Sequence, residues 1–450
     1  MTATDSRALD NHTSSAADEP GAGILGVYRV EQRKLASQLS TRLAVVVCVL
    51  APFAFAGILR VQSGVPADSL FGVWVHQSGF AIPMVILSFA ANWGFPVLAG
   101  VIAGDLFASE DRYGTWKMVL TRSCRRSELF LGKVLAVGTV MVVLAIVVTI
   151  SSLVAGLVFV GDQGLVSLSG VMLSSGRSLL MVLLSWLTSV LPALAFVSLA
   201  VLFSVATRSG IMGVLGPVLV ALLMQLLALI GTGYWVHTWL VASAFDGWHG
   251  LLAAHPYYRP LILGIVVSLA WIAVCLGLAW TILRSRDFAG TSVSRRGGWL
   301  RSVRIAVVIA VGVAVLAIGS NWGPSAVTAS KLEAAIKPTF NNLTLLQQHV
   351  LGRKVPKGAH LNDFAQCQRR SGSLKGPGDD WVCTMNMLIV LDGPNPFSFT
   401  PVAFDVSVKA NGCYKADGPA GFIGQPTMRD AHGNQTVNPL YSFDGCFDPT

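Results

Sequence analysis

The feature that most constrains this chain is a series of long apolar runs that are almost free of charged residues. The runs lie at 43–60, 79–104, 134–160, 178–206, 210–231, 260–283 and 305–320. A helix needs about 20 apolar residues to cross the hydrocarbon core of a bilayer, and the runs approach or exceed this length. The sequence therefore predicts an α-helical polytopic membrane protein with seven spans, of which the seventh is the shortest.

The composition agrees with this prediction. Of the 450 residues, 53% are hydrophobic and 12% are charged, with a mean hydropathy of +0.63. Charged residues make up about a quarter of a typical soluble domain, so a water-soluble globule could not cover its surface with this chain. The net charge of +9 lies mostly at the ends of the spans. Since no nucleic-acid-binding module is present, we expect a lipid bilayer as a partner and no nucleic acid.

The distribution of basic residues predicts the orientation, because Lys and Arg are retained in cytoplasmic loops. One alternate set of loops holds only Arg60, Arg177 and Arg259. The other set holds Arg29, Arg33, Lys34 and Arg42, then Arg112, Lys117, Arg122, Arg125, Arg126 and Lys133, then Arg208, then Arg284, Arg286, Arg295, Arg296, Arg301 and Arg304. We therefore expect a multi-pass protein of the cell membrane with a cytoplasmic N-terminus and an extracytoplasmic C-terminal region.

The C-terminal region, 321–450, has the character of a small secreted domain. It contains four of the seven cysteines, Cys367, Cys383, Cys413 and Cys446, which agrees with an oxidising compartment. Four cysteines allow three pairings that the sequence does not distinguish; we favour Cys367 with Cys383 and Cys413 with Cys446. Apolar residues recur at helical spacing in 331–351, and 381–391 and 402–408 suit strands. The sequence predicts an α+β, disulfide-bonded extracytoplasmic domain.

The other segments are assigned by composition. Residues 1–21 are small, polar and acidic and predict a disordered cytoplasmic tail. Residues 22–42 mix apolar and charged side chains, as an amphipathic helix in the membrane interface does. The chain then divides into a six-span core at 43–284, a cytoplasmic linker at 285–304, the seventh span at 305–320 and the external domain. Signal-peptide cleavage near Ala54 to Ala56 is disfavoured, because the lead-in of about 40 residues is too long.

The loop between the second and third spans, GDLFASEDRYGTWKMVLTRSCRRSELFLGK at 104–133, carries the most informative pattern. It resembles the loop of ABC-2 type permeases, the membrane subunits of ATP-binding cassette exporters. In that family an acidic helix with Gly-Thr, a small-residue turn and a closing Gly-Lys join these spans. The matching residues are Glu110, Gly114, Thr115, Leu120, Thr121, Arg122, Arg126, Leu131, Gly132 and Lys133. Cys124 stands where the family often has proline.

The resemblance extends over the first six spans, and 28–41 also resembles the family's N-terminal interface helix. It implies that the loop docks in a cleft of a separate cytoplasmic ATPase and transmits its closure to the spans. It also implies dimerisation with a second permease copy or a paralogue. The residues assigned to coupling are Glu110, Asp111, Arg112, Gly114, Thr115, Arg122, Arg125, Arg126 and Lys133. The alternative is a solvated basic loop, but alternating charges around Gly114 and Thr115 favour coupling.

Motifs for self-powered transport and for catalysis are absent from the sequence. There is no G-x-x-x-x-G-K-[ST] phosphate loop, and Gly132-Lys133 is followed by valine. The span interiors hold no charged residue that would couple ion flow. Neither H-E-x-x-H nor G-x-S-x-G occurs. We therefore expect no catalytic residues and no cofactor in this chain, with ATP and Mg²⁺ bound by the partner ATPase.

A few polar or helix-breaking residues interrupt the spans, among them Asn92, Pro96 and Gln225. They are candidates for a substrate pathway or a contact between subunits. Helix packing with local repair of the backbone is the more frequent role of such residues.

The external link at 231–259 is rich in aromatic residues, which favour the membrane interface and predict a half-buried re-entrant hairpin. Its three histidines, His237, His249 and His255, match no compact zinc spacing. No metal site is expected.

Together these patterns favour a permease subunit that moves a hydrophobic or amphipathic substrate out of the cell, since the spans offer few charges. The alternative is a non-transporting sensor or assembly factor whose external domain binds a ligand and signals to a cytoplasmic ATPase. Movement of cargo, and whether the external domain is dispensable, would distinguish the two.

Overall fold

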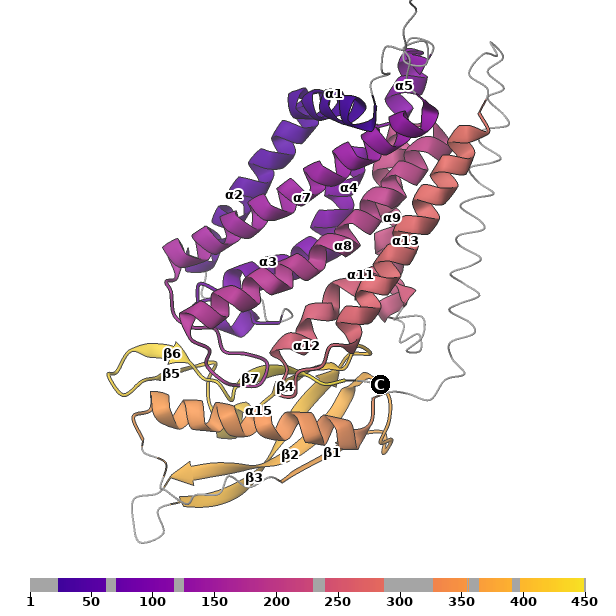
Figure 1. Ribbon diagram of the computed structural model, residues 1–450. Coiled ribbons are helices and arrows are strands. Elements are labelled where there is room, and N and C mark those ends of the chain that lie inside the picture. Colours follow the sequence, from indigo (N-terminus) through magenta and orange to yellow (C-terminus); the bar gives the residue numbers. More distant parts are fainter. Residues whose placement is uncertain are drawn as a thin grey trace, which may run out of the picture.

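A computed structural model describes residues 23–61, 70–116, 125–229, 239–286, 327–353, 355, 364–390 and 397–448. This described part contains six apolar helices long enough to cross a membrane. They form one bundle, and a small domain of strands and one long helix packs against one end of it (Figure 1). The chain is therefore a mostly helical membrane protein with an added C-terminal domain.

The six predicted spans of the core are all present as helices. They are α2 (Leu39–Val61), the composite α3 (Ala81–Phe89), η2 (Ala90–Gly94) and α4 (Phe95–Ala103), then α7 (Arg126–Phe159), α8 (Ser175–Thr207), α9 (Gly210–Leu229) and α13 (Arg259–Arg284). The last described residue of the bundle is Arg286, and the next described residue is Val327 of the C-terminal domain. The predicted seventh span, 305–320, lies between these points, outside the described residues.

The second span is interrupted by the π-helical turn η2, which contains Asn92. Pro96 follows in the first turn of α4, and proline has no N–H to donate to the carbonyl four residues earlier, that of Asn92. Gln225 of α9 donates its side-chain N–H to this same carbonyl oxygen. Three residues singled out in the sequence thus belong to one feature, a helix break repaired by a neighbouring helix.

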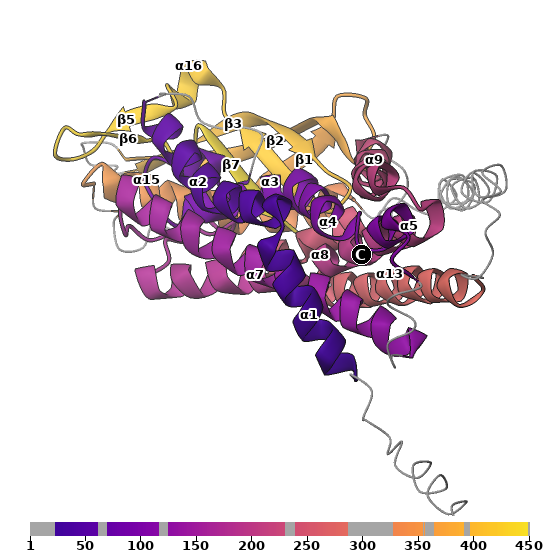
Figure 2. The same cartoon turned by 90° about the horizontal axis from the view of Figure 1, so that it is seen from above.

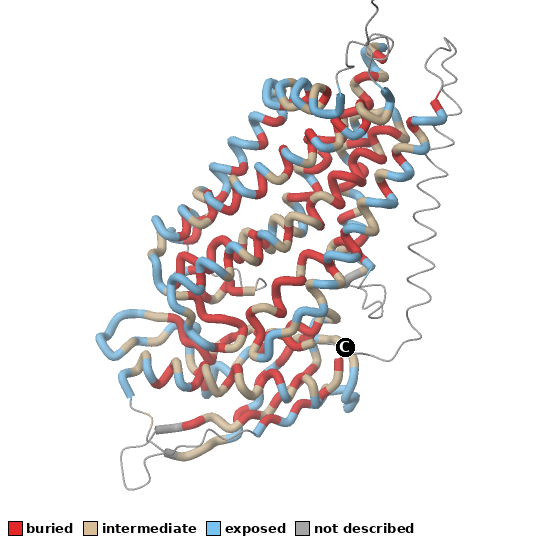
Figure 3. The backbone as a smooth tube through the Cα atoms, viewed as in Figure 1, coloured by how far each residue is buried: buried red, intermediate tan, exposed pale blue. Residues whose placement is uncertain are grey.

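Small residues allow the helices to approach closely. Gly104 at the end of α4 lies against Gly213 of α9, and neither position has room for a Cβ atom. At α7, Gly132 gives the same close approach to the N-terminal helix. Buried residues line the facing sides of the helices and apolar exposed residues face outward (Figure 3), with α8 the most enclosed of the six. This pattern suits a bundle whose outer surface contacts lipid.

The N-terminal helix α1 (Ile24–Ser37) lies across the ends of α2 and α7, in a direction different from theirs (Figure 2). The sequence predicted an interface helix over 22–42, and the structure ends it earlier. Gln38 has an extended ψ of 136°, which breaks the helix, and Leu39 begins α2. We refer to this end of the bundle as the α1 end; the C-terminal domain lies at the opposite end (Figure 1).

Short helices precede two of the spans. Helix η1 (Gly72–Trp74) lies before the second span, and the predicted re-entrant segment contains α11 (Val241–Ala244), η3 (Phe245–Trp248) and α12 (His249–Leu252) before α13. Phe245 and Trp248 are buried, and the Phe245 ring stacks on Phe95 of α4 and Phe196 of α8. The described part of this link therefore packs into the bundle as a series of short helices.

The C-terminal domain is α+β. Helix α15 (Ala329–Val350) covers a five-stranded antiparallel sheet of order β1-β2-β3-β4-β7. The strands are β1 (Ala365–Arg369), β2 (Gly378–Val390), β3 (Phe397–Val408), β4 (Cys413–Asp417) and β7 (Ser442–Cys446); β5 (Thr427–Arg429) pairs with β6 (Gln435–Val437), after the short α16 (Ala420–Ile423). Phe340 of α15 packs on Phe404 and Phe443 of the sheet, so alternate strand residues and one helix face make the core.

Two disulfides fix neighbouring strands. Cys367 of β1 is bonded to Cys383 of β2, and Cys413 of β4 to Cys446 of β7. In each case the two residues are direct cross-strand partners in the register. This is the pairing favoured among the three that the sequence allowed.

The C-terminal domain contacts three separate loops of the bundle. Asn342 of α15 donates to the carbonyl of Ser169, 2.7 Å away, in the loop between α7 and α8. Asn411 donates to the Asp246 carboxylate of η3 at 2.9 Å. A hydrogen bond also joins Gln77 to Thr436, between the loop after η1 and β6. We call this three-part contact the docking interface.

Candidate functional site

The coupling loop of the sequence analysis begins with α5 (Ala108–Tyr113), a short helix at the α1 end (Figure 1). The hydroxyl of Ser204 in α8 accepts hydrogen bonds from the backbone N–H groups of Phe107 and Ala108, at 3.1 and 3.2 Å. These amides have no partner within the helix, so a serine from another span takes the capping role. The start of α5 is thereby fixed to the bundle.

A buried cluster of charges joins α5 to α1 and α7. The ammonium of Lys133 in α7 lies 2.7 Å from the carboxylate of Glu31 in α1 and 3.2 Å from that of Glu110 in α5. Lys34 adds a second contact to Glu110 at 3.0 Å, and Thr115 donates its hydroxyl to the same carboxylate. The Lys133 side chain is 1% exposed and those of both glutamates are 9% exposed.

The cluster is neutral as a set, because two lysines face two carboxylates. Replacing a residue of this cluster so that a buried charge is left without a partner costs about 3–5 kcal/mol of stability. The ring of Phe107 also lies under the Lys133 ammonium, 5.8 Å from it, which adds a cation–π contact. The three helices are therefore held as one unit.

A second ion pair fastens the end of α5 to α13. Arg286, which is buried, lies 3.0 Å from the Asp111 carboxylate, and the indole N–H of Trp116 donates to the same carboxylate at 2.8 Å. Burial lowers the pKa of Arg286, against the attraction of Asp111. Arg126 donates to the backbone carbonyl of Arg284 at 3.3 Å. Four spans thus hold α5 in place. They are α4, which precedes α5 in the chain, and α7, α8 and α13, which contact it.

The other predicted coupling residues that the structure describes lie at the surface. Arg112 and Tyr113 form an exposed tip, with Arg112 paired to Asp105 at 2.8 Å. Gly114 ends α5 with a φ of +65°, a conformation that favours glycine. Arg125 and Arg126 are exposed. Arg122 and the turn at Cys124 lie outside the described residues.

Sequence reasoning found Glu110 and Lys133 but missed their environment. Both were assigned to a loop that meets a partner, whereas the structure buries both side chains. It also missed Glu31 and Lys34 as partners of Lys133 and Glu110, and Ser204 and Arg286 as partners of other residues at α5, because all four lie 76–175 positions away from the groups they contact. The one available signal was the acidic Glu31 within a basic helix.

The docking interface at the opposite end also contains the titratable group of Asp444 in β7. Asp444 faces a small pocket lined by Phe71, Trp74, Val166, Ser167, Leu168, Leu343 and Phe443. Its carboxylate accepts a hydrogen bond from the backbone N–H of Phe71, which has a positive φ of 65°. Burial raises the pKa of Asp444 to about 7, against the opposing attraction of Lys415 and Lys409. The interface therefore holds a carboxyl group that titrates near neutrality.

A family model described as a protein of unknown function (DUF2705) matches residues 44–289, more than half of the chain. The match begins inside α2 and ends just beyond α13, so it includes α5 and the buried residues Glu110 and Lys133. It includes neither α1 nor the C-terminal domain. No curated protein matches the chain.

Proposed function

The chain belongs to the DUF2705 family, and we propose that it is the membrane-spanning permease subunit of an ATP-binding cassette exporter. In this proposal a separate cytoplasmic ATPase binds ATP and Mg²⁺, and two permease copies, or one copy and a paralogue, form the pathway. The α1 end faces the cytoplasm, because the basic loops gather there, and the C-terminal domain is extracytoplasmic. The chain itself has no catalytic role.

The observation that carries the proposal is the contact of Lys133 with Glu31 and Glu110. A flexible loop would absorb a push from a partner, whereas α5 is tied by buried charges to α1 and α7 and by Ser204 to α8. A displacement of α5 is therefore passed to several spans together. This is the mechanical property that a coupling element between an ATPase and a transport pathway needs.

The surface around α5 supports a partner at the same place. Tyr113 is 71% exposed, and the side chain of Arg112 is 55% exposed beside it. A rim that combines exposed arginine with an aromatic residue is the composition enriched in protein interfaces. We assign Arg112 and Tyr113 to contact with the ATPase, and Glu110 and Lys133 to positioning that contact.

The substrate assigned here is hydrophobic or amphipathic. The apolar helices offer few charges, and the polar feature in mid-membrane is the break at Asn92 with its Gln225 donor. Such π-helical turns often occur at functional sites, because they leave backbone groups that can change partner. The break gives the second span a point at which to bend when α5 moves.

The test is purification of the tagged chain in mild detergent, followed by mass spectrometry and an ATPase assay. The informative variant is Arg112→Ala with Tyr113→Ala, which changes the exposed tip without touching the buried cluster. Its matched control is Tyr258→Ala with Arg259→Ala, the same two residue types exposed at the opposite end. We expect an ATPase subunit to co-purify with wild type and control and to be lost or uncoupled with the tip variant. Absence of any nucleotide-binding partner from wild type would overturn the proposal.

A second function, a membrane sensor, is favoured by the docking interface. The C-terminal domain contacts three loops through Asn342, Asn411 and Thr436, so a ligand bound to it would affect several helices. Truncation after Arg286 distinguishes the two functions, with folding checked by gel filtration. A truncated chain that still stimulates its ATPase and moves cargo supports the exporter, whereas ATPase control that requires the domain, without cargo movement, supports the sensor.

A further inference from the structure

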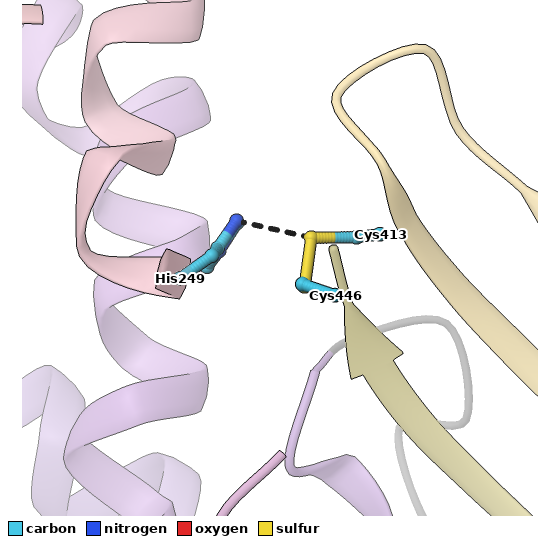
Figure 4. Close-up of side chains that lie close together, drawn as sticks. All are labelled: His249, Cys413 and Cys446. Atoms are coloured by element: carbon cyan, nitrogen blue, oxygen red, sulfur yellow. Dashed lines mark hydrogen bonds between the residues drawn. A yellow bond between two sulfur atoms is a disulfide. The ribbon is translucent and has the colours of Figure 1, made fainter. Parts of the chain in front are cut away.

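The docking interface places a histidine of the bundle against a disulfide of the C-terminal domain (Figure 4). Cys413 of β4 and Cys446 of β7 form the disulfide, and His249 is the first residue of α12. The His249 Nδ1 atom lies 3.5 Å from the Cys413 sulfur. The three residues are buried, with 7%, 3% and 3% of their surface exposed for His249, Cys413 and Cys446.

The ligand atoms of the three side chains lie close enough together to bind one metal ion. One ring nitrogen and both sulfur atoms lie within 4.8 Å of one another. Around a tetrahedral zinc ion, with Zn–S of about 2.3 Å and Zn–N of about 2.0 Å, ligand atoms lie roughly 3.5 to 3.8 Å apart. Opening of the disulfide would separate the two sulfurs toward that spacing, and the imidazole already faces them.

The other ring nitrogen lies on the side of a carboxylate, at a distance longer than a hydrogen bond. His249 Nε2 lies 4.0 Å from the Asp246 carboxylate, which is held at 2.9 Å by Asn411 of the C-terminal domain. The negative charge of a carboxylate on this side of the ring favours a proton on Nε2, which leaves Nδ1 free to face the metal. Trp248 adds an edge contact to the ring, 4.0 Å between centroids. The histidine is thus positioned by its surroundings and not only by packing on the disulfide.

We propose that reduction of the Cys413–Cys446 disulfide forms a binding site for one thiophilic divalent cation, with His249 as the third ligand. A dithiol or phosphine reductant supplies two electrons, the S–S bond breaks, and each sulfur takes up one proton. The cation then displaces both thiol protons and accepts the lone pair of His249 Nδ1. Two thiolates balance the two positive charges, so the buried site is neutral. Water completes a tetrahedral shell.

Reduction and metal binding would change which parts of the molecule are linked. In the oxidised protein, the covalent bond joins β4 to β7 within the C-terminal domain. In the reduced, metal-bound protein, the ion joins both strands to α12 of the bundle. The redox state would therefore select between a bond inside the domain and a bond across the docking interface. This inference does not depend on the transport proposal, because no step involves an ATPase or a cargo.

The second disulfide provides an internal control. Cys367–Cys383 is equally buried and also joins two neighbouring strands. Within the residues that the structure describes, only the Cys413–Cys446 pair has a third ligand of this kind within 4.8 Å. The two pairs therefore differ chiefly in the presence of His249.

The experiment measures Zn²⁺ bound by the full chain in detergent, before and after reduction with a phosphine. Alkylation and mass spectrometry count the reduced cysteines, and elemental analysis counts zinc after free ion is removed. We expect reduction to add one zinc per chain, and Co²⁺ in its place to give sulfur-to-metal charge-transfer absorption. The variants are His249→Ala and Cys413→Ser with Cys446→Ser. Their matched controls are His255→Ala, an exposed histidine of the same link, and Cys367→Ser with Cys383→Ser.

The expected result is loss of the added zinc in the first two variants and its retention in both controls. Circular dichroism and gel filtration confirm that each variant is folded, and the oxidised protein provides the baseline for the other cysteines. The proposal is wrong if reduced wild type binds no more zinc than oxidised protein, or if His249→Ala binds as much as wild type. It is also wrong if Cys413–Cys446 stays oxidised where Cys367–Cys383 is reduced.

Discussion

The ammonium of Lys133 lies 2.7 Å from the carboxylate of Glu31, a residue 102 positions earlier in the chain. This contact crosses from the first turns of α7 to the N-terminal helix α1, and a second contact from the same ammonium reaches Glu110 of α5. The most buried lysine of the described residues therefore determines how three helices meet at the α1 end.

Replacement of Lys133 by methionine should destabilise the bundle strongly. It removes the ion-pair partner of Glu31 and leaves Glu110 with Lys34 and the Thr115 hydroxyl, and breaking a buried pair in this way costs about 3–5 kcal/mol. Lys34→Met should cost no more than about 1 kcal/mol, because 41% of that side chain is exposed. Thermal unfolding in detergent measures both. Adding Glu31→Gln to Lys133→Met should recover part of the loss; equal midpoints for the two single variants would contradict this account.

Gly132→Ala should displace α1 from the bundle. A Cβ at this position would lie 2.7 Å from the Val27 side chain and 3.1 Å from the carbonyl of Ile24, and overpacking of this kind costs about 1–3 kcal/mol. Gly138→Ala on the same helix is the control, because its nearest neighbour would be 3.7 Å away. Limited trypsin digestion at Arg29 and Arg33 reports release of α1. We expect faster cleavage in Gly132→Ala only, and equal rates would show that α1 accommodates the methyl group.

Gln225→Leu should weaken the bundle by about 0.5–2 kcal/mol. It removes the N–H that reaches the Asn92 carbonyl, and hydrogen bonds between membrane helices are worth about this much. Pro96→Ala in the same background should restore stability, since alanine supplies the backbone N–H that proline lacks. The double-mutant cycle is measured by thermal unfolding. Additive effects of the two substitutions would mean that Pro96 and Gln225 do not act on the same carbonyl.

The stability of the C-terminal domain should fall as pH rises from about 4 to about 7. The folded domain holds a proton on Asp444 up to pH about 7, whereas the unfolded chain releases it near pH 4. Unfolding therefore releases a proton in this window, and stability declines until both states are ionised. Asp444→Asn should remove the decline and be more stable than wild type at pH 8, by about 1–4 kcal/mol.

Unfolding midpoints of the oxidised protein between pH 4 and pH 8.5 measure this effect. Asp405→Asn is the control, because that side chain is 66% exposed at the sheet surface. Wild type and Asp444→Asn should agree at pH 4 and separate above pH 5. Parallel profiles over the whole range would mean that Asp444 is ionised in the folded domain.

The sequence predicted the six core helices because hydrophobicity at spanning length is a local signal. It also predicted the C-terminal helix over 331–351, because the apolar residues recur every three or four positions there. It did not predict the end of α1 at Ser37, since no proline or glycine marks that break. The sequence also did not predict the π-helical turn, although Asn92, Pro96 and Gln225 were each singled out as candidates.

The candidate sites are formed by contacts between residues that lie far apart in the sequence, and sequence patterns do not reveal such contacts. Glu110 was identified, but its burial follows from Lys34 and Lys133, which reach it from other helices. His249 was considered only with the histidines of its own link, and its contact with Cys413 spans 164 positions. Spacing rules detect metal ligands that lie close together in the sequence. They cannot predict a site whose ligands come from two parts of the chain that meet only after the domain docks.

The docking interface has a consequence for the order in which the molecule is made. The C-terminal domain meets the bundle at Gln77, Ser169 and Asp246, and every one of these residues is synthesised before the domain. Thr436, which contacts Gln77, lies 359 positions after it in the chain. The interface can form only after all three loops are in position, so a completed interface marks a chain whose helices have already been inserted correctly.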